Sequence, residues 1–316
     1  MTADNGVVIR RTKGFYYVRA DKDEEIECKI KGQLFKDSQY DNQVAVGDKV
    51  EFIREHAGDI GLIKALQDRK SFLSRNRVGK EAEQVIAANI DHMLIVSAAK
   101  NPPFRTNLVN RMLVAANAGN IKPILVISKT DLVENSFLNE ISDPYQEVGL
   151  EIIPFTNTQP NKNEALLDVL IGHVSVLVGQ SGVGKSTILN TLFPSLDLKV
   201  GKIGVKTRKG LHTTTYAMMH RIAENSYVID TPGIREFGLW NVTQDNLDEY
   251  YPGFADQRNK CKHRDCNHVH EPECAIKEAV KSKTIHRLLY DGYVSIFETL
   301  SGYHQNKIVY PNGHRT

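Results

Sequence analysis

Several common sequence features are scarce or missing in this chain, and each absence narrows the class of protein. There is no run of about 18 apolar residues, so nothing predicts a membrane-spanning helix or a membrane among the partners. The opening residues, MTADNGVVIR, contain no apolar core and no cleavage site, so they do not read as a signal peptide. Neither sign of charge is in excess, because 40 Lys and Arg face 38 Asp and Glu. The net charge of +2 therefore says little about partners.

Cysteine is also rare, and its placement is uneven. Cys28 stands alone, whereas Cys261, Cys266 and Cys274 lie close together near the C-terminus. A secreted disulfide scaffold has an even, dispersed set of cysteines. The pattern predicts a reduced, cytoplasmic protein with a metal site. With 316 residues, the chain is long enough for two or three domains.

The strongest positive signal is a glycine-rich loop with the sequence GQSGVGKST. It matches the phosphate-binding pattern GxxxxGK[ST] and stands between an apolar strand and a helical stretch. Its glycines allow backbone N–H groups to point at a phosphate, its lysine reaches the β- and γ-phosphates, and the following serine ligates magnesium. The residues expected to surround the phosphates are Gly179, Gln180, Ser181, Gly182, Val183, Gly184, Lys185, Ser186 and Thr187.

Two further motifs follow this loop. Asp230 and Gly233 belong to a DTPG turn after a short apolar strand, where the carboxylate can hold magnesium through water and the glycine N–H can sense the γ-phosphate. The polar, basic segment 202–215 between the two motifs has the character of a switch loop. One threonine of its TTT run is expected to complete the magnesium shell. Thr213, Thr214 and Thr215 are the three candidates; we assign Thr213 and Thr214 to the nucleotide site and Thr214 also to the metal.

The base-reading motif precedes the phosphate loop, although an ordinary GTPase carries it afterwards. It comprises Ser128, Lys129, Thr130 and Asp131. The Asp131 carboxylate can accept hydrogens from guanine N1 and N2, a pattern that adenine does not offer, and the Lys129 stem can lie along the ring. Ser128 stands where Asn is usual, so one polar contact is shortened or lost. Thr156 is a candidate for a second base-contacting loop. By itself, the motif also fits a strand-end turn, but its reversed position predicts a circularly permuted GTPase domain.

The rest of the pattern divides the chain into three parts: 1–70, 71–242 and 243–316. The first contains short β-rich runs, which predict an oligonucleotide-binding (OB) barrel or another small barrel. The second alternates continuous apolar runs with helical spacing, which is typical of a doubly wound parallel α/β sheet. Between them, the basic segment 69–80 is either a solvated linker face or a strip that contacts phosphates.

The C-terminal cluster reads Cys261-x4-Cys266-x-His268-x5-Cys274. Three thiolates and an imidazole form the closed shell that zinc prefers in structural sites. His263 and His270 are competing ligands, and His268 is preferred because it lies on the same turn as Cys266.

Taken together, these motifs, with GLHTTT, DTPGIREFGL and AIKEAV, resemble the RsgA (YjeQ/YloQ) family over essentially the whole chain. The resemblance implies a circularly permuted GTPase domain flanked by an N-terminal all-β OB barrel and a C-terminal, mainly helical zinc domain. It also implies GTP/GDP, Mg and Zn as cofactors, activity late in maturation of the small ribosomal subunit, stimulation by that subunit and binding to its rRNA. A monomer is expected.

The group that orients the attacking water is not evident from the sequence. A Gln often follows the DxxG turn of a GTPase, but here Ile234 takes that position. His212, just before the threonine run, is the candidate, and Lys185 is the other catalytic residue expected. Two rival functions are an RNA-binding module with a structural, non-hydrolysed nucleotide and a P-loop ATPase. Asp131 argues against the ATPase.

Overall fold

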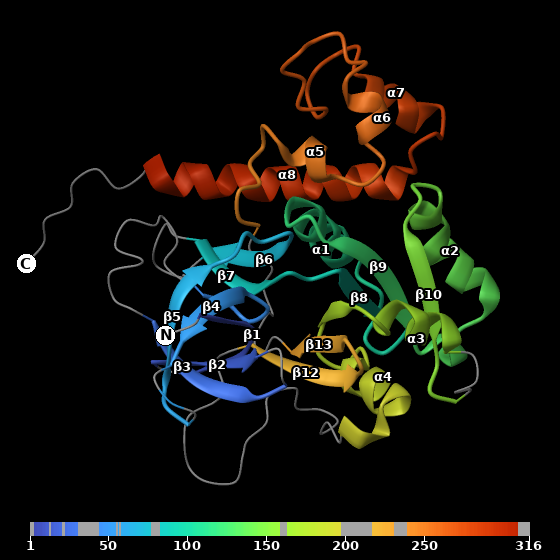
Figure 1. The fold of residues 1–316 in the computed structure, drawn as a ribbon. Coiled ribbons are helices and arrows are strands. Elements are labelled where there is room, and N and C mark those ends of the chain that lie inside the picture. The colour runs from blue at the N-terminus through green and yellow to red at the C-terminus, as the bar shows by residue number, and fades with distance from the viewer. Residues whose placement is uncertain are drawn as a thin grey trace, which may run out of the picture.

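The computed structural model describes residues 3–12, 14–20, 23–30, 44–54, 56, 58–76, 83–158, 163–196, 217–230 and 239–308. Figure 1 shows a β-barrel, an α/β sheet beside it, and a helical cap above both.

The N-terminal strands close into a small barrel. They are β1 (Asp4–Thr12), β2 (Phe15–Ala20), β3 (Glu25–Ile30), β4 (Lys49–Ile53) and β5 (Gly61–Leu66). The order β1-β2-β3-β5-β4 returns to β1, and β3 runs parallel to β5. Side chains alternate between the barrel core and the outside, with Val18, Phe52 and Ile63 fully buried. This five-stranded barrel is OB-like and confirms the first of the two barrel types considered above.

The sheet continues from the barrel into the α/β domain, because β1 pairs with β12. Its strands are β8 (His92–Ala98), β9 (Lys122–Ser128), β10 (Glu151–Phe155), β11 (Val174–Val178), β12 (Met218–Ala223) and β13 (Ser226–Asp230). Their order in space is β10-β9-β8-β11-β13-β12, and only β12 runs antiparallel to its neighbour. Within the α/β domain, β8, β9 and β10 precede β11 in the chain and lie on one side of it, whereas β12 and β13 follow it and lie on the other. This order confirms the circular permutation.

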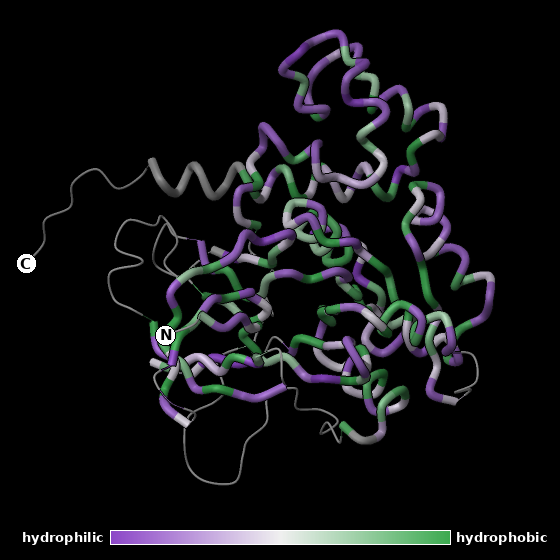
Figure 2. Tube along the Cα trace, viewed as in Figure 1, coloured by the Kyte–Doolittle hydropathy of each residue, from purple (hydrophilic) through white to green (hydrophobic). Residues whose placement is uncertain are grey.

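Helices and short turns connect these strands. They are α1 (Thr106–Ala118), η1 (Thr130–Leu132), α2 (Asn135–Gln146), α3 (Glu164–Leu170), α4 (Lys185–Leu192) and η3 (Pro194–Leu196). The strands β8 and β9 are buried along almost their whole length, as continuous apolar runs predict. Figure 2 shows the same contrast, with hydrophobic segments in the sheet and hydrophilic loops around it.

The basic segment after the barrel is in part a β-strand rather than a linker. Residues 72–76 form β6 (Phe72–Asn76), which pairs with β7 (Glu83–Ala88). Arg69 forms a bidentate pair with the fully buried Asp48, at 2.7 and 2.8 Å. A buried carboxylate needs such a partner, so Arg69 stabilises the barrel and its guanidinium is already engaged. The rest of the segment, 77–80, lies outside the described residues.

The C-terminal part is mainly helical, as expected. It contains α5 (Leu247–Tyr250), α6 (Ala255–Arg258), α7 (Ala275–Lys281) and the long α8 (Arg287–Ile308). In Figure 1, α8 runs above α1, and the loops around α6 and α7 lie above the N-terminal end of α8, at the right of the view. Among the described residues, no helix is both long and apolar enough to span a membrane.

Candidate nucleotide and zinc sites

The glycine-rich loop has the backbone shape that a phosphate cradle requires. Gly179, Gly182 and Gly184 have positive φ values of 145°, 81° and 100°. A Cβ on Gly179 would lie 2.1 Å from the Val96 carbonyl oxygen of the neighbouring strand. Only glycine tolerates both the conformation and the close approach. The loop ends in α4, which begins at Lys185.

Lys185 lies across this loop. Its Nζ donates to the carbonyls of Gly179 at 2.7 Å and Gln180 at 2.9 Å. Burial lowers the pKa of Lys185, and the negative charge of Asp230 acts in the opposite direction. An anionic ligand here would therefore meet a partly buried ammonium group, where charge interactions are weakly screened.

The base-reading motif and the phosphate loop meet in space, although many residues separate them in the chain. Ser128 ends β9 and is buried, and its Oγ donates to the Val183 carbonyl at 2.5 Å. Lys129 donates from Nζ to the Gly182 carbonyl at 2.8 Å and to the Asn101 carbonyl. This closeness is what the permuted order predicted. The contact with Asn101 had no signal in the sequence.

Asp131 lies beside the second predicted base loop. Thr156 donates from Oγ1 to Asp131 Oδ1 at 2.8 Å, and Thr130 Oγ1 lies 3.4 Å from the Phe155 carbonyl. The Asp131 side chain is exposed. The ends of β9 and β10 thus bring these groups to one edge, where a base could reach the carboxylate.

Two of the residues predicted to bind magnesium, Ser186 and Asp230, lie in the described part of the chain. Ser186 lies in the first turn of α4, which follows β11 after the phosphate loop, and Asp230 is the last residue of β13, which pairs with β11. Both therefore belong to the carboxyl edge of the sheet, where ligands of open α/β sheets bind. The expected Thr213, Thr214, His212 and Gly233 lie outside the described residues.

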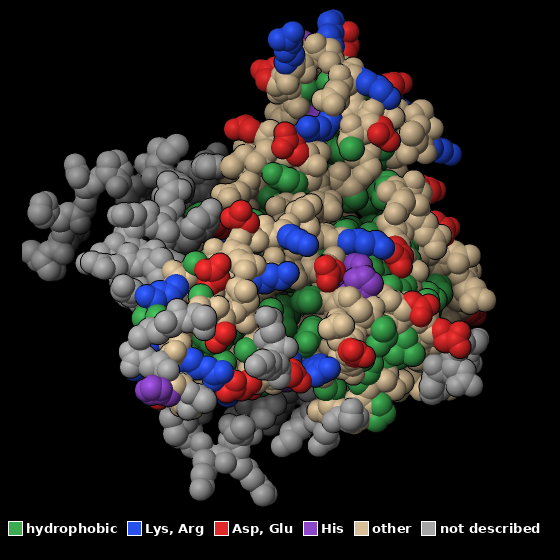
Figure 3. Space-filling view, in the orientation of Figure 1, with side chains coloured by type: hydrophobic (Ala, Val, Ile, Leu, Met, Phe, Trp, Pro, Cys, Tyr) green, Lys and Arg blue, Asp and Glu red, His purple; other side chains and the backbone are tan. Residues whose placement is uncertain are grey.

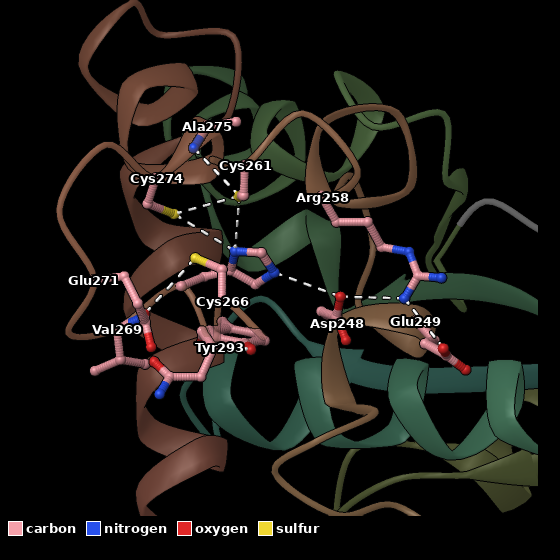
Figure 4. A network of polar contacts seen from close by, with 12 residues as sticks. Asp248, Glu249, Arg258, Cys261, Cys266, Val269, Glu271, Cys274, Ala275 and Tyr293 are labelled. Atoms are coloured by element: carbon pink, nitrogen blue, oxygen red, sulfur yellow. Dashed lines mark hydrogen bonds and ion pairs between the residues drawn. The ribbon is translucent and has the colours of Figure 1, made fainter. Parts of the chain in front are cut away.

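The four predicted zinc ligands converge in the C-terminal part (Figure 4). The ligand atoms of Cys261, Cys266, His268 and Cys274 all lie within 4.8 Å of one another. The Sγ atoms of Cys261 and Cys274 are 3.9 Å apart, and His268 Nδ1 is 3.4 and 3.5 Å from them. A tetrahedral ion with Zn–S near 2.3 Å and Zn–N near 2.0 Å requires separations of about 3.8 and 3.5 Å. The donor set and spacing therefore fit zinc.

Asp248 orients the imidazole from outside this shell. His268 Nε2 lies 3.4 Å from Asp248 Oδ2, which leaves Nδ1 for the metal. Arg258 donates to the same carboxylate oxygen at 3.1 Å and also pairs with Glu249. Burial opposes ionisation of Asp248, but the hydrogen bond from His268 and the charge of Arg258 outweigh it and lower its pKa. Histidine ligands of zinc commonly use such a carboxylate.

A separate cavity of about 1380 Å³ opens at the opposite edge of the parallel sheet. It lies between the barrel, the first residues of the sheet strands and α5. Figure 3 shows Lys and Arg side chains intermixed with Asp and Glu on the face shown. The basic residues lining the cavity are Arg19, Lys49, Lys70, Lys122 and Arg221. It is not the nucleotide site, because the phosphate loop lies at the other ends of the strands.

Comparisons with known proteins agree with this geometry. The RsgA GTPase family model matches residues 66–240, and the RsgA N-terminal domain model matches residues 5–63. The chain is 34% identical over 300 residues to "Small ribosomal subunit biogenesis GTPase RsgA" of Flavobacterium psychrophilum, covering 93% of this chain and 92% of that protein. A relative of the same name in Chlorobaculum tepidum is 36% identical over 306 residues, with 94% and 98% covered.

Solved structures show the same likeness. YjeQ from Thermotoga maritima is 28% identical with a TM-score of 0.76, covering 95% of this chain and 99% of that one. The circularly permuted GTPase YloQ is 25% identical with a TM-score of 0.72, covering 99% and 98%. Members of this family are P-loop enzymes that hydrolyse GTP with magnesium. The permuted sheet, the loops that meet at its edge and these matches lead to one conclusion: the chain belongs to the RsgA GTPase family.

Proposed function

We propose that this GTPase acts late in maturation of the small ribosomal subunit and hydrolyses GTP to GDP and phosphate faster when bound to that subunit. The observation that supports this role is the joining of one nucleotide site to a barrel and a zinc module in a single chain. Relatives named for small ribosomal subunit biogenesis share more than 90% of its length. We propose that it works as a monomer in the cytoplasm.

Within the site, the residues from Gly179 to Thr187 hold the phosphates, and the loop from Ser128 to Asp131 with Thr156 holds guanine. Ser186, Asp230 and Thr214 are the residues assigned to magnesium, which neutralises phosphate charge when bound. Gly233 offers its N–H to the γ-phosphate. Lys185 contributes a positive charge where negative charge develops during phosphoryl transfer.

His212 is proposed to orient the attacking water through a neutral imidazole. Its position in the chain, just before the threonine run, supports the assignment. Replacing His212 with Ala is then expected to remove most of the subunit-stimulated rate while GTP affinity and subunit binding persist. If stimulated turnover survives, rRNA or another side chain positions the water.

The barrel and the zinc domain are proposed to bind rRNA. Basic side chains line the cavity beside the barrel, and Arg264 is exposed in the zinc loops. Arg69 and Arg258 are weaker candidates for phosphate contacts than their sequence positions indicate, because each already pairs with a carboxylate. Binding that depends on phosphate contacts weakens steeply with salt, so binding that does not change with salt would indicate a protein partner instead.

The deciding experiment measures phosphate release from GTP and ATP, with and without purified small subunits. The proposal expects slow release from GTP alone, a large increase with subunits, and no comparable activity with ATP. Lys185→Ala is the inactive control. Subunit binding without any GTP turnover would favour an RNA-binding module with a structural nucleotide, and turnover of ATP would favour an ATPase.

A further inference from the structure

The buried hydroxyl of Ser128 has one hydrogen to donate, and the structure shows where it goes. Ser128 is 1% exposed, and its Oγ lies 2.5 Å from the Val183 carbonyl oxygen and 3.5 Å from the Ser97 carbonyl oxygen. A serine hydroxyl donates once, and the shorter distance identifies Val183 as the acceptor. No hydrogen of this side chain remains for a ligand.

An asparagine in the same position would behave differently. Its amide carries two N–H donors, so one can bind the Val183 carbonyl while the other reaches an acceptor on a bound base. Guanine has such an acceptor at N7, in addition to its N1–H and 2-amino donors. The carboxylate of Asp131 can accept hydrogen bonds from N1–H and the 2-amino group, but it has no hydrogen to donate to N7.

We infer that this protein binds guanine without a side-chain contact from Ser128 to N7, and that Ser128 is instead a positioning residue for the phosphate loop. The inference rests on the proposed function, because it takes the Ser128–Asp131 loop as the guanine site. It deepens that proposal by stating which edge of the base contributes to specificity.

The positioning role follows from the planarity of the peptide group. Ser128 and Lys129 are successive residues, and they bind the successive carbonyls of Val183 and Gly182. In a trans peptide, the carbonyl of one residue points opposite to the N–H of the next. Ser128 and Lys129 hold these two carbonyls toward the Ser128–Asp131 loop. The N–H groups of Val183 and Gly184 therefore point the opposite way, where they can face a phosphate.

The test compares the dissociation constants of GTP and 7-deaza-GTP, in which N7 is replaced by C–H. For the unaltered protein, the two constants should agree within about twofold. Ser128→Asn should create a preference for GTP of roughly 2- to 10-fold, the usual range for one hydrogen bond. Ser128→Ala should weaken the binding of both nucleotides equally, by about 5-fold or more, because the Val183 carbonyl loses its hydrogen-bond donor. Ser128→Thr keeps the hydroxyl and should restore much of the affinity.

Ser175→Ala is the matched control, because Ser175 is a buried serine of β11 whose Oγ has no hydrogen-bond partner within the described part of the chain. It should change neither constant. Thermal unfolding of every variant identifies those that do not fold. The ratio of the GTP and 7-deaza-GTP dissociation constants is measured on the unaltered protein and so does not depend on the folding of any variant.

A strong preference of the unaltered protein for GTP over 7-deaza-GTP, not increased by Ser128→Asn, would overturn the inference. ITP, which lacks the 2-amino group, separates this failure from that of the proposed function. Weaker binding of ITP than of GTP supports recognition by Asp131. Equal binding of ITP and GTP would overturn the guanine assignment itself, and the inference with it.

Discussion

Gly292 of α8 lies against Asn110 of α1 so closely that a Cβ on Gly292 would be 2.0 Å from the Asn110 Nδ2 atom. Asn110 is fully buried and accepts a hydrogen bond from the Tyr145 hydroxyl at 3.0 Å. The same Cβ would lie 2.7 Å from the Tyr251 hydroxyl. The long C-terminal helix is thus fitted directly onto a helix of the GTPase domain, and the two parts share one core.

Gly292→Ala should therefore destabilise the protein, although alanine is the better helix former. Overpacking of this kind costs about 1–3 kcal/mol, which exceeds the gain in helix propensity. Urea unfolding measures the difference. Asp291→Ala, on the exposed side of the same helix, should cost no more than about 0.5 kcal/mol through its pair with Arg287. Equal stability of Gly292→Ala and the unaltered protein would show that α8 shifts without cost.

Asp131→Asn should move nucleotide preference from guanosine toward xanthosine. The carboxylate accepts from two donors of guanine, whereas an amide can donate to the 2-oxo group of xanthine. Competition between GTP and XTP for the protein measures the change. Asp143→Asn, an exposed residue of α2, should leave selectivity unaltered. Unchanged preference in Asp131→Asn would indicate that the motif is only a turn.

Removing the zinc should unfold the ligand loops while GTP binding persists. One zinc per chain is expected, and Cys266→Ser or a strong chelator should release it, because metal binding supplies much of the folding energy of small zinc modules. Metal analysis and circular dichroism follow the loss. Cys28→Ala, in the barrel, should keep its zinc. The helix α8 should remain packed, since Leu289 and Tyr293 belong to the shared core.

Asp248→Asn should lower zinc affinity about 10- to 100-fold without removing a ligand, because it weakens the partner that orients His268. Competition with a coloured zinc chelator gives the affinity. Asp256→Asn changes an exposed residue of α6 and is the control, which should retain full zinc affinity. If both variants bind zinc equally, the contact between His268 and Asp248 does not tune the metal.

Stability should fall as the pH drops below about 6.5, in part because of His92. Burial lowers the pKa of His92, and the neighbouring His173 and Lys122 add to this, while the Val169 carbonyl opposes it. The unfolded chain then binds the proton more readily, so the stabilisation is present above the unfolded pKa and is lost as pH falls through the folded one. His92→Asn should reduce this slope in urea unfolding between pH 7.5 and 5.5, and exposed His56→Asn should not.

The sequence predicted the elements whose signals are local. Continuous apolar runs located β8, β9, β11 and β13, and the glycine pattern located the phosphate loop, because each needs only neighbouring residues. The partners of Arg69, Ser128 and His268 were missed, since Asp48, Val183 and Asp248 become neighbours only when distant segments pack. No spacing rule connects such pairs. The switch residues His212 to Thr214 remain predictions.

The permuted order of the sheet also decides when each half of the site exists during synthesis. Asp131 precedes Gly179 by roughly 50 residues in the sequence. A chain grows from its N-terminus at about 5–20 residues per second. The guanine-reading half therefore leaves the ribosome seconds before the loop whose carbonyls it must hold. Until β11 is made and pairs with β8, the new chain has a base pocket without a phosphate cradle. Its ability to bind nucleotide arrives late, after most of the protein has been translated.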